Sequence, residues 1–281
     1  MTFVNTDQAE FWSSMARTWV EMDHRLEHTA GEPGRMAMDR LDPRPGERIL
    51  DLGCGTGPTS VELGTRVGQG GSVVGVDIAE EMLVRARQRA SEHGSHNVSF
   101  LHADVQAGSL GSHEYDAAFS RFGVMFYSDP AAAFSRVREA LRPGGRLSFV
   151  CWQGATANEW MLVPGAAVMS VTGTPPPTPA PGQPGPFSLC DPGLVRSILA
   201  TAGFSQAEVE PHNDVVTFGA EHIDEQAASA LRMGAAREAL RDADEATIRL
   251  AHGAVVDALR SKVHDGEVRL ARGVLLVDAR A

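Results

Sequence analysis

The residues best able to do chemistry lie in one turn, Ile49-Leu-Asp-Leu-Gly-Cys-Gly-Thr-Gly57. A short apolar strand is expected to run into closely spaced glycines, with a helix beginning behind them. Such a turn lets a ligand lie against bare backbone while the N–H groups of the helix point toward it. The pattern predicts a ligand-binding loop made of Gly53, Cys54, Gly55, Thr56 and Gly57.

Asp51, just before the first glycine, discriminates between two classes of ligand. A dinucleotide would place a pyrophosphate beside this carboxylate, which is repulsive in a partly buried site. The dinucleotide-binding fingerprint also has Gly or Ala at the position that Pro58 occupies in this chain. S-adenosylmethionine carries an ammonium and a sulfonium, so Asp51 could accept charge-assisted hydrogen bonds from it, directly or through water. We expect S-adenosylmethionine, with an NAD-dependent oxidoreductase as the alternative.

Two further carboxylates follow the next two predicted strands. Asp77 ends the second strand, where it could accept from both ribose hydroxyls, a feature shared with dinucleotide folds. Asp104 follows the third strand and could accept from an adenine amino group, with Ile78 and Val105 as apolar walls. Any one of these acids could be an ordinary turn residue. Together with the glycine loop they fit one cationic nucleoside.

The residues after the fourth and fifth predicted strands are candidates for the reacting end of the site. We expect Ser120 and Arg121 near the sulfonium, although Arg121 could instead pair with a protein carboxylate. Phe122 could face the cation, or it could be a core aromatic. Trp152 could line an apolar acceptor pocket, with core packing as the equal alternative.

The sequence does not identify a general base, because the loop after the fourth strand contains no histidine. His252 is a weak candidate, since it shares a helical apolar stripe with Ile248, Val255 and Leu259, where a structural core histidine is favoured. His24 and His28 lie one helical turn apart, but a solvated face is favoured over a metal site. The cysteines have no CxxC spacing, so neither a zinc site nor a disulfide framework is expected.

The elements around these residues alternate between strands and helices, which predicts a parallel sheet with helices on both faces. Residues 1–45 are expected to be helical, punctuated by Pro33 and Gly34, and the proline-rich segment 175–186 is expected to be an extended loop. The expected strands are 48–52, 72–77, 97–102, 115–119, 146–151, 206–211 and 273–279. The expected helices are 57–68, 80–93, 130–142 and 192–202, with two more within 222–264.

These motifs resemble those of class I S-adenosylmethionine-dependent methyltransferases. The matching segments are Ile49–Gly57, Val74-Gly-Val-Asp-Ile78, Ala103-Asp-Val105 and Leu141-Arg-Pro-Gly-Gly-Arg-Leu147. Two more, Phe119-Ser-Arg-Phe-Gly-Val-Met-Phe126 and Gly185-Pro-Phe-Ser-Leu189, are similar to bacterial small-molecule methyltransferases of quinone biosynthesis and natural-product tailoring. The resemblance implies an α/β, Rossmann-like fold with a seven-stranded, mostly parallel sheet, an antiparallel last strand and an α-helical cap.

The resemblance also implies a division of the chain and an activity. We expect an N-terminal helical cover (1–45), a cofactor-binding core (46–151), a lid-like insertion (152–191), a core continuation (192–212), a helical cap (213–267) and a last core strand (268–281). The expected reaction is methyl transfer to a small organic acceptor. A hydroxyl oxygen is the preferred methyl acceptor, and nitrogen or carbon are the alternatives. A non-catalytic nucleoside-binding protein is the remaining alternative.

Composition limits the partners of the protein. The 281 residues carry a net charge of −11 and a single lysine, Lys262, whereas nucleic-acid binders usually present a basic face. No run approaches the roughly 18 apolar residues of a membrane span. The first residues lack the basic and apolar runs of a signal peptide. We therefore expect a cytoplasmic protein with a small-molecule acceptor and without nucleic-acid or membrane partners.

Overall fold

The computed structural model describes residues 3–176 and 183–281. These residues divide into two compact units. The first contains 3–152, 183–211 and 274–281, and the second contains 153–176 and 212–273. Pro177, Pro179 and Pro181 of the predicted proline-rich loop lie outside the described residues, whereas Pro175 and Pro176 lie in a stretch without helix or strand.

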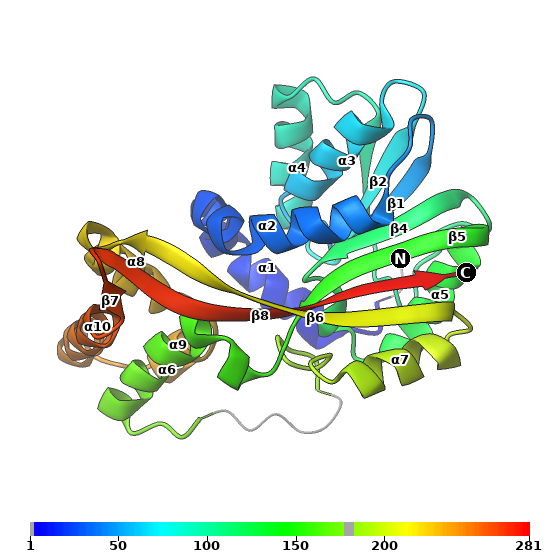
Figure 1. Cartoon of the computed structure of the whole chain (residues 1–281). Helices are drawn as coiled ribbons and strands as arrows, with labels where there is room; N and C mark the ends of the chain where they lie inside the picture. Colours follow the sequence, from blue (N-terminus) through cyan, green and yellow to red (C-terminus); the bar gives the residue numbers. More distant parts are fainter. Residues whose placement is uncertain (1–2, 177–182) are drawn as a thin grey trace. The chain divides into compact units, whose positions relative to one another are not determined.

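One sheet runs through the structure in the order β3-β2-β1-β4-β5-β8-β6 (Figure 1). Its first five strands are all parallel to their neighbours, and β8 runs antiparallel to β5. The predicted mostly parallel sheet with an antiparallel last strand is therefore confirmed, whereas the sheet has eight strands where seven were predicted. The strands are β1 (Arg48–Leu52), β2 (Ser72–Asp77), β3 (Val98–His102), β4 (Tyr115–Arg121), β5 (Leu141–Trp152), β6 (Ser205–Gly219) and β8 (Glu267–Arg280).

The end of the chain contains more strand than the sequence indicated. Both β6 and β8 extend well beyond 206–211 and 273–279, and each contributes residues to both units. A short eighth strand, β7 (Val263–His264), pairs with the start of β8. The extra residues alternate in burial or lie on the half-exposed part of the sheet, so they lack the continuous apolar run that marks a central strand.

The central strands are buried on both faces, which explains their apolar runs. Ile49, Leu50 and Leu52 of β1 have no exposed surface, and neither do Ala118 and Phe119 of the adjacent β4. The register pairs Leu50 with Val74 on one side and with Ala118 on the other. These strands form the core of the first unit and set the positions of the residues at their ends.

The helices of the first unit pack on this sheet and on one another. Asp129 and Asp191 accept hydrogen bonds from the first turns of α5 and α7, each of which has proline at its first position. The helices are α1 (Thr6–Glu21), α2 (Asp23–Leu41), α3 (Pro58–Val67), α4 (Glu80–Glu92), α5 (Pro130–Ala140) and α7 (Pro192–Thr201), with the 3₁₀ turn η1 (Val124–Phe126).

The N-terminal region corrects one prediction. Pro33 and Gly34 do not interrupt the helix, because α2 continues through both and ends at Leu41. Both residues are buried, and α2 packs on β4 and β5. Tertiary packing therefore outweighs the poor helix propensity of proline and glycine at these positions.

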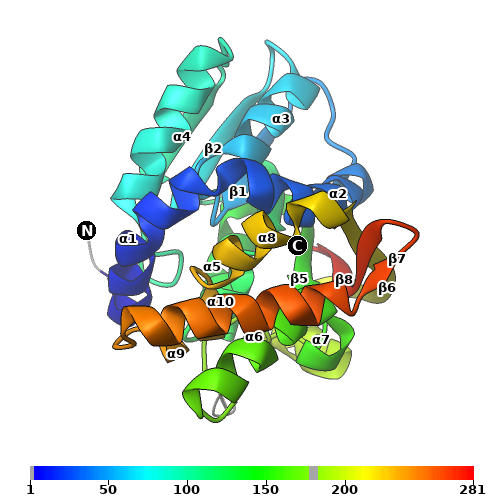
Figure 2. The same ribbon diagram turned by 90° about the vertical axis from the view of Figure 1, so that its left-hand side faces the viewer.

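The second unit has its own apolar core, built on α6 (Glu159–Thr172) and α10 (Glu245–Arg260), which pack together (Figure 2). The two helices expected within 222–264 are three: α8 (Ile223–Ala230), α9 (Gly234–Ala239) and α10. Residues 231–233 separate the first two, α9 begins at Gly234 with φ +49°, and the Asp244 side chain caps the third. Two 3₁₀ turns, η2 (Ala155–Ala157) and η3 (Ala220–His222), complete this unit.

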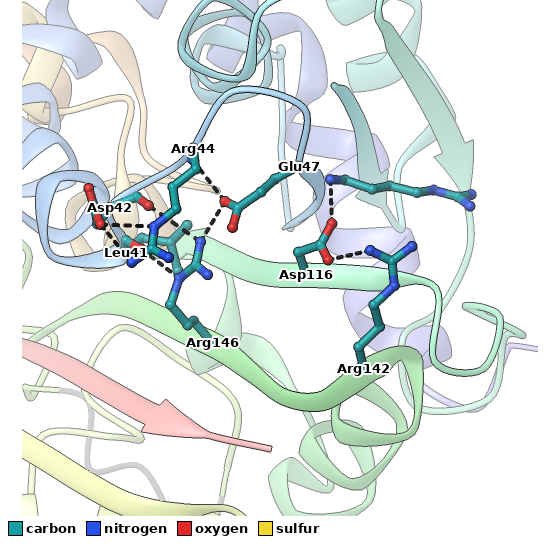
Figure 3. A network of polar contacts seen from close by, with 8 residues as sticks. Leu41, Asp42, Arg44, Glu47, Asp116, Arg142 and Arg146 are labelled. Carbon is teal, nitrogen blue, oxygen red and sulfur yellow. Dashed lines mark hydrogen bonds and ion pairs between the residues drawn. The ribbon is translucent and has the colours of Figure 1, made fainter. Parts of the chain in front are cut away.

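An ion-pair network ties together the amino ends of β1, β4 and β5 in the first unit (Figure 3). Arg146 of β5 contacts the Glu47 carboxylate at 2.5 Å and donates to the Leu41 carbonyl at 2.9 Å. Asp116 of β4 accepts from the backbone N–H of Arg48 at 2.9 Å and pairs with Arg142. The network lies at the strand ends opposite those that carry the predicted ligand contacts.

In residues 3–176 and 183–281 we find no helix that combines the length and the apolarity needed to cross a bilayer.

Candidate cofactor site

The glycine loop after β1 adopts the backbone that its composition demands. Gly53, Gly55 and Gly57 all have φ between +55° and +82°, in the left-handed region that glycine enters without strain. A Cβ on Gly53 would lie 2.9 Å from the Cα of Gly123, so this glycine lets the loops after β1 and β4 touch. No atom lies within 4 Å of a Cβ placed on Gly55. The loop therefore presents bare backbone to open space at Gly55.

Asp51 is fully buried at the end of β1. Its Oδ2 accepts from Thr59 Oγ1 at 2.7 Å and from Ser60 Oγ at 2.6 Å. Its Oδ1 has no hydrogen-bond partner among the described residues. Burial raises the pKa of Asp51 to about 6, against the opposing effect of the two hydroxyls and of Arg121. A partnerless buried carboxylate oxygen is the acceptor that a cationic ligand group would satisfy.

Asp77 holds the glycine loop to the end of β2. Its carboxylate accepts from the backbone N–H of Gly55 at 2.8 Å and from that of Ala79 at 2.9 Å. Burial raises the pKa of Asp77, although these backbone bonds favour the charged form. The two carboxylate oxygens offer four acceptor positions, more than the backbone N–H groups of Gly55, Ile78 and Ala79 use, so Asp77 keeps capacity for a ribose hydroxyl.

Asp104, after β3, is buried and already bonded by backbone donors. Its Oδ2 accepts from the N–H groups of Val4 and Asn5, both at 2.9 Å, and its Oδ1 accepts from that of Gln106 at 2.9 Å. The sequence analysis did not foresee the contact with the N-terminal segment, because no local pattern links residues so far apart in the chain.

The strand order brings the three acids together. Because β3, β2 and β1 are parallel neighbours, their carboxyl ends meet at one edge of the sheet. Ile78 lies half-buried at this edge, with its carbonyl 3.0 Å from His102 Nε2, and Val105 is buried. Cys54 differs from its neighbours, because its thiol packs in the core against α4 and leaves only its backbone on the loop. Burial raises the pKa of that thiol.

Ser120 and Arg121, at the end of β4, both have partners within the protein. Ser120 is buried and donates to the Leu52 carbonyl at 2.7 Å, which ties β4 to the end of β1. Arg121 Nη1 contacts Glu27 Oε2 of α2 at 2.7 Å, the protein carboxylate that the sequence analysis offered as the alternative partner. Their contact with a cofactor stays a prediction.

Phe122 and Trp152 form a stacked pair at the carboxyl ends of β4 and β5. Their ring centroids lie 3.8 Å apart with an interplanar angle of 10°. Phe122 has φ +59°, a left-handed backbone that costs a non-glycine residue about 1–3 kcal/mol. The stack and a bond from the Phe122 N–H to the Val150 carbonyl hold this conformation. The strained backbone of Phe122 thus directly precedes Gly123, which lies against Gly53 of the glycine loop.

The helix α2 also contacts the glycine loop, which the sequence analysis missed. Thr56 Oγ1 donates to Asp23 Oδ1 at 2.9 Å, and the other oxygen of Asp23 pairs with Arg89 of α4. Trp12 of α1 packs edge-on against Phe126 of η1, with ring centroids 4.8 Å apart. Helical periodicity predicted these helices, but only the folded chain shows which strand ends they reach.

His252 lies on α10 of the second unit. Its Nε2 is 3.2 Å from the Asp224 carbonyl of α8, within the same unit. The stripe predicted for this face is only partly buried, because Ile248 is 39% exposed while Val255 and Leu259 are buried. The observed contact is the kind expected of a structural histidine.

These features fit a cationic nucleoside. The partnerless oxygen of Asp51 can accept from an ammonium, Asp77 retains acceptor capacity, and the open backbone at Gly55 leaves room beside both. The acids would repel a pyrophosphate at the same place.

Known proteins share this fold and these motifs. A family profile described as a methyltransferase domain matches residues 49–145. Aklanonic acid methyltransferase DauC of Streptomyces sp. (strain C5) is 35% identical over 116 residues, which are 41% of this chain and 53% of that protein. Nocamycin O-methyltransferase of Saccharothrix syringae is 34% identical over 190 residues, 64% of this chain and 67% of that protein. The matched part thus spans about half to two thirds of these relatives.

A solved structure agrees on the fold. Phosphoethanolamine N-methyltransferase 2 of Haemonchus contortus, in complex with S-adenosyl-L-methionine, has a TM-score of 0.54 at 20% identity, covering 89% of this chain and 52% of that one. This likeness establishes the architecture, and the sequence relatives establish the family. The chain belongs to the class I S-adenosylmethionine-dependent methyltransferase family, and small-molecule methyltransferases are among its relatives.

Proposed function

We propose that this protein transfers the methyl group of S-adenosylmethionine to a hydroxyl group of a small organic molecule. The observation that carries the proposal is the buried, partnerless oxygen of Asp51 beside the glycine loop. The family excludes the NAD-dependent alternative. The name of the Saccharothrix relative, an O-methyltransferase, favours oxygen over nitrogen or carbon.

The cofactor contacts follow from the strand ends. Asp51 accepts from the ammonium, the backbone of Gly53–Gly57 lies along the amino-acid part, and Asp77 accepts from the ribose. Asp104 accepts from the adenine amino group between Ile78 and Val105, with Ser120 and Arg121 nearest the sulfonium. When bound, S-adenosylmethionine supplies an activated methyl group on a cationic sulfur.

The acceptor is proposed to lie against Phe122 and Trp152. Trp152 is buried and backs the half-buried Phe122 ring, so the exposed part of Phe122 offers an apolar surface at the end of β4. The task of these residues is to align the acceptor oxygen and to exclude water, since alignment supplies much of the catalysis of a displacement.

His252 remains the only named candidate for the general base. A base would give a pH–rate profile that moves or flattens in His252→Asn, whereas a structural role at Asp224 would change stability and leave the profile unchanged. We also propose a cytoplasmic location and a small-molecule acceptor, without nucleic-acid or membrane partners.

Calorimetric titration of S-adenosylmethionine tests the cofactor site. We expect Asp77→Ala to weaken binding by about tenfold or more, since it removes charge-assisted hydrogen bonds. Asp77→Asn is the matched control, because it keeps an acceptor for the Gly55 N–H and should lose less affinity. Unaltered affinity in Asp77→Ala would contradict the proposal.

Transfer itself is tested with labelled S-adenosylmethionine and a panel of hydroxylated aromatic acceptors. We expect S-adenosylhomocysteine to form with some of them and the label to appear on oxygen by mass spectrometry and NMR. Label on nitrogen or carbon would replace the hydroxyl assignment. Binding without transfer to any acceptor class would instead support a non-catalytic nucleoside-binding protein.

A further inference from the structure

Asn5 connects the loop after β3, which contains Asp104, with the segment η1 that follows β4. Its backbone N–H donates to Asp104 Oδ2, and its side-chain Nδ2 donates to the carbonyl of Phe126 in η1, both at 2.9 Å. Asp104 follows β3, and η1 follows β4, so one N-terminal residue joins elements that lie 99 and 121 positions away.

The side chain of Asn5 does not cap the helix at whose start it lies. Asn5 occupies the N-cap of α1, where asparagine usually accepts a hydrogen bond from the first turn of its own helix. It makes no such cap, and its amide reaches η1 instead. Asn5 is also buried, so this contact is shielded from water. The Asn5 side chain therefore holds the strand-end loops, whereas only its backbone carbonyl, which accepts from the Ala9 N–H, belongs to α1.

A second bridge joins the same loops on the other side of Asp104. The Gln106 N–H donates to Asp104 Oδ1 at 2.9 Å, and the Gln106 side chain contacts Ser128 Oγ at 3.0 Å and accepts from the Asp129 N–H at 2.6 Å. Both oxygens of Asp104 are thus fixed by donors whose own side chains hold the segment after β4.

Three backbone donors leave Asp104 with a defined remaining capacity. Val4 and Asn5 take the two acceptor positions of Oδ2, and Gln106 takes one of the two on Oδ1. The one position left lies on Oδ1, and its direction depends on the orientation of the carboxylate. Of the two bridges, the one through Asn5 holds Oδ2 from an element outside the sheet.

We infer that Asn5 is a positioning residue for nucleobase recognition: it orients the Asp104 carboxylate so that its remaining acceptor position meets the amino group of adenine. The inference rests on the proposed function of Asp104. The site then discriminates adenine from a base with a carbonyl at that position, because two acceptors facing each other leave both without a donor.

Binding of S-adenosylhomocysteine and of S-inosylhomocysteine, in which a carbonyl replaces the adenine amino group, tests this role. We expect the wild-type chain to prefer S-adenosylhomocysteine by about tenfold or more. In Asn5→Ala the affinity for S-adenosylhomocysteine should fall by about fivefold, and the preference over the inosine analogue should shrink by a similar factor.

Thr6→Ala is the matched control. Thr6 is the exposed first residue of α1 and directly follows Asn5, whereas the donors to the Asp104 carboxylate are Val4, Asn5 and Gln106. We expect both affinities to stay at wild-type values. Val4→Pro removes the backbone N–H that Val4 donates to Asp104 Oδ2. It should lower the preference as Asn5→Ala does, which keeps the test open if Asn5→Ala folds poorly.

The outcomes separate the inference from the function on which it rests. Equal loss of both affinities in Asn5→Ala, with the preference unchanged, would overturn the positioning role and leave a merely structural one. A wild-type chain that binds both analogues equally would remove Asp104 from adenine recognition, and the inference with it. A wild-type chain that binds neither would contradict the proposed function itself.

Discussion

Asp51 is a carboxylate with no exposed surface, and hydroxyl donors satisfy only one of its oxygens. Burial disfavours the ionised form more than the two hydroxyls and the charge of Arg121 favour it, which is why the pKa of Asp51 rises to about 6. A ligand that brings positive charge would relieve this cost. Asp51 therefore lowers the free energy of unfolding of the ligand-free chain and raises the affinity for a cationic ligand.

The pH dependence of Asp51 has a definite sign. The ordinary pKa of an aspartate is 3.8 and that of Asp51 in the folded chain is about 6, so the folded chain retains a proton between these values that the unfolded chain has released. The free energy of unfolding therefore falls as pH rises from about 4 to about 6, and the loss is complete above that window. At about 1.4 kcal/mol per pKa unit the full effect is about 3 kcal/mol.

Asp51→Asn should consequently stabilise the ligand-free protein. We expect the free energy of unfolding in urea to rise by about 1–3 kcal/mol at pH 7.5, with the gain shrinking as pH falls toward 4. Affinity for S-adenosylmethionine should fall in the same variant. Asp257→Asn, at an exposed position of α10, is the control and should show neither effect. A destabilised Asp51→Asn at pH 7.5 would show that the carboxylate is favourably paired without ligand.

The helix α2 shows how packing overrides local propensity. Gly31 and Gly34 lie one turn apart, and a Cβ on either would collide with a charged side chain, Glu27 at the first and Arg121 at the second. The glycines therefore let the Glu27–Arg121 pair lie against the helix at the end of β4. Gly34, which the sequence analysis interpreted as an interruption of the helix, instead lets the Arg121 side chain lie close to α2.

Two glycine substitutions separate propensity from packing. Gly253 lies within α10 with open space around a Cβ, so Gly253→Ala should stabilise the protein by about 0.5–1 kcal/mol. Gly34→Ala gains the same propensity but must displace Arg121, so we expect a net loss of about 1 kcal/mol or more. Urea unfolding of both variants measures the difference, and a stabilised Gly34→Ala would show that Arg121 moves aside freely.

At the scale of the whole molecule, the two edges of the sheet in the first unit carry different tasks. The carboxyl ends of β1–β5 hold the acids, the glycine loop and the aromatic pair. The amino ends hold the Arg146–Glu47 network of Figure 3. Parallel strands make this division possible, because all their carboxyl ends face the same way.

Removing an ion pair at the amino ends should therefore affect stability alone. Arg146 and Glu47 are each 14% exposed, so Arg146→Ala leaves a poorly hydrated carboxylate and should cost about 1–3 kcal/mol. Arg142→Ala removes a partner that is 51% exposed and should cost less than about 1 kcal/mol. Affinity for S-adenosylmethionine, measured by calorimetry, should match wild type in both. A weakened affinity in Arg146→Ala would mean that the two edges are coupled.

Much of the fold was predictable because its signals are local. The strand β1 is a short apolar run followed by Gly53, β2 is one that ends at Asp77, and the family profile covers residues 49–145. The extensions of β6 and β8, the third helix within 222–264 and the exposure of Ile248 were not predictable. Those features depend on which side of a helix or strand is exposed to water. The periodicity of apolar residues does not predict that exposure.

The sequence by itself determined the central strands of the sheet, the ligand class and the position of the three acids, since strand ends and their charges are read from neighbouring residues. Only the tertiary structure decided which partners those acids have. Thr59 and Ser60 face Asp51, Gly55 faces Asp77, and the N-terminal Val4 and Asn5 face Asp104. The physical reason is that a buried carboxylate takes whatever donors the fold brings within reach, and many of those donors come from distant parts of the chain.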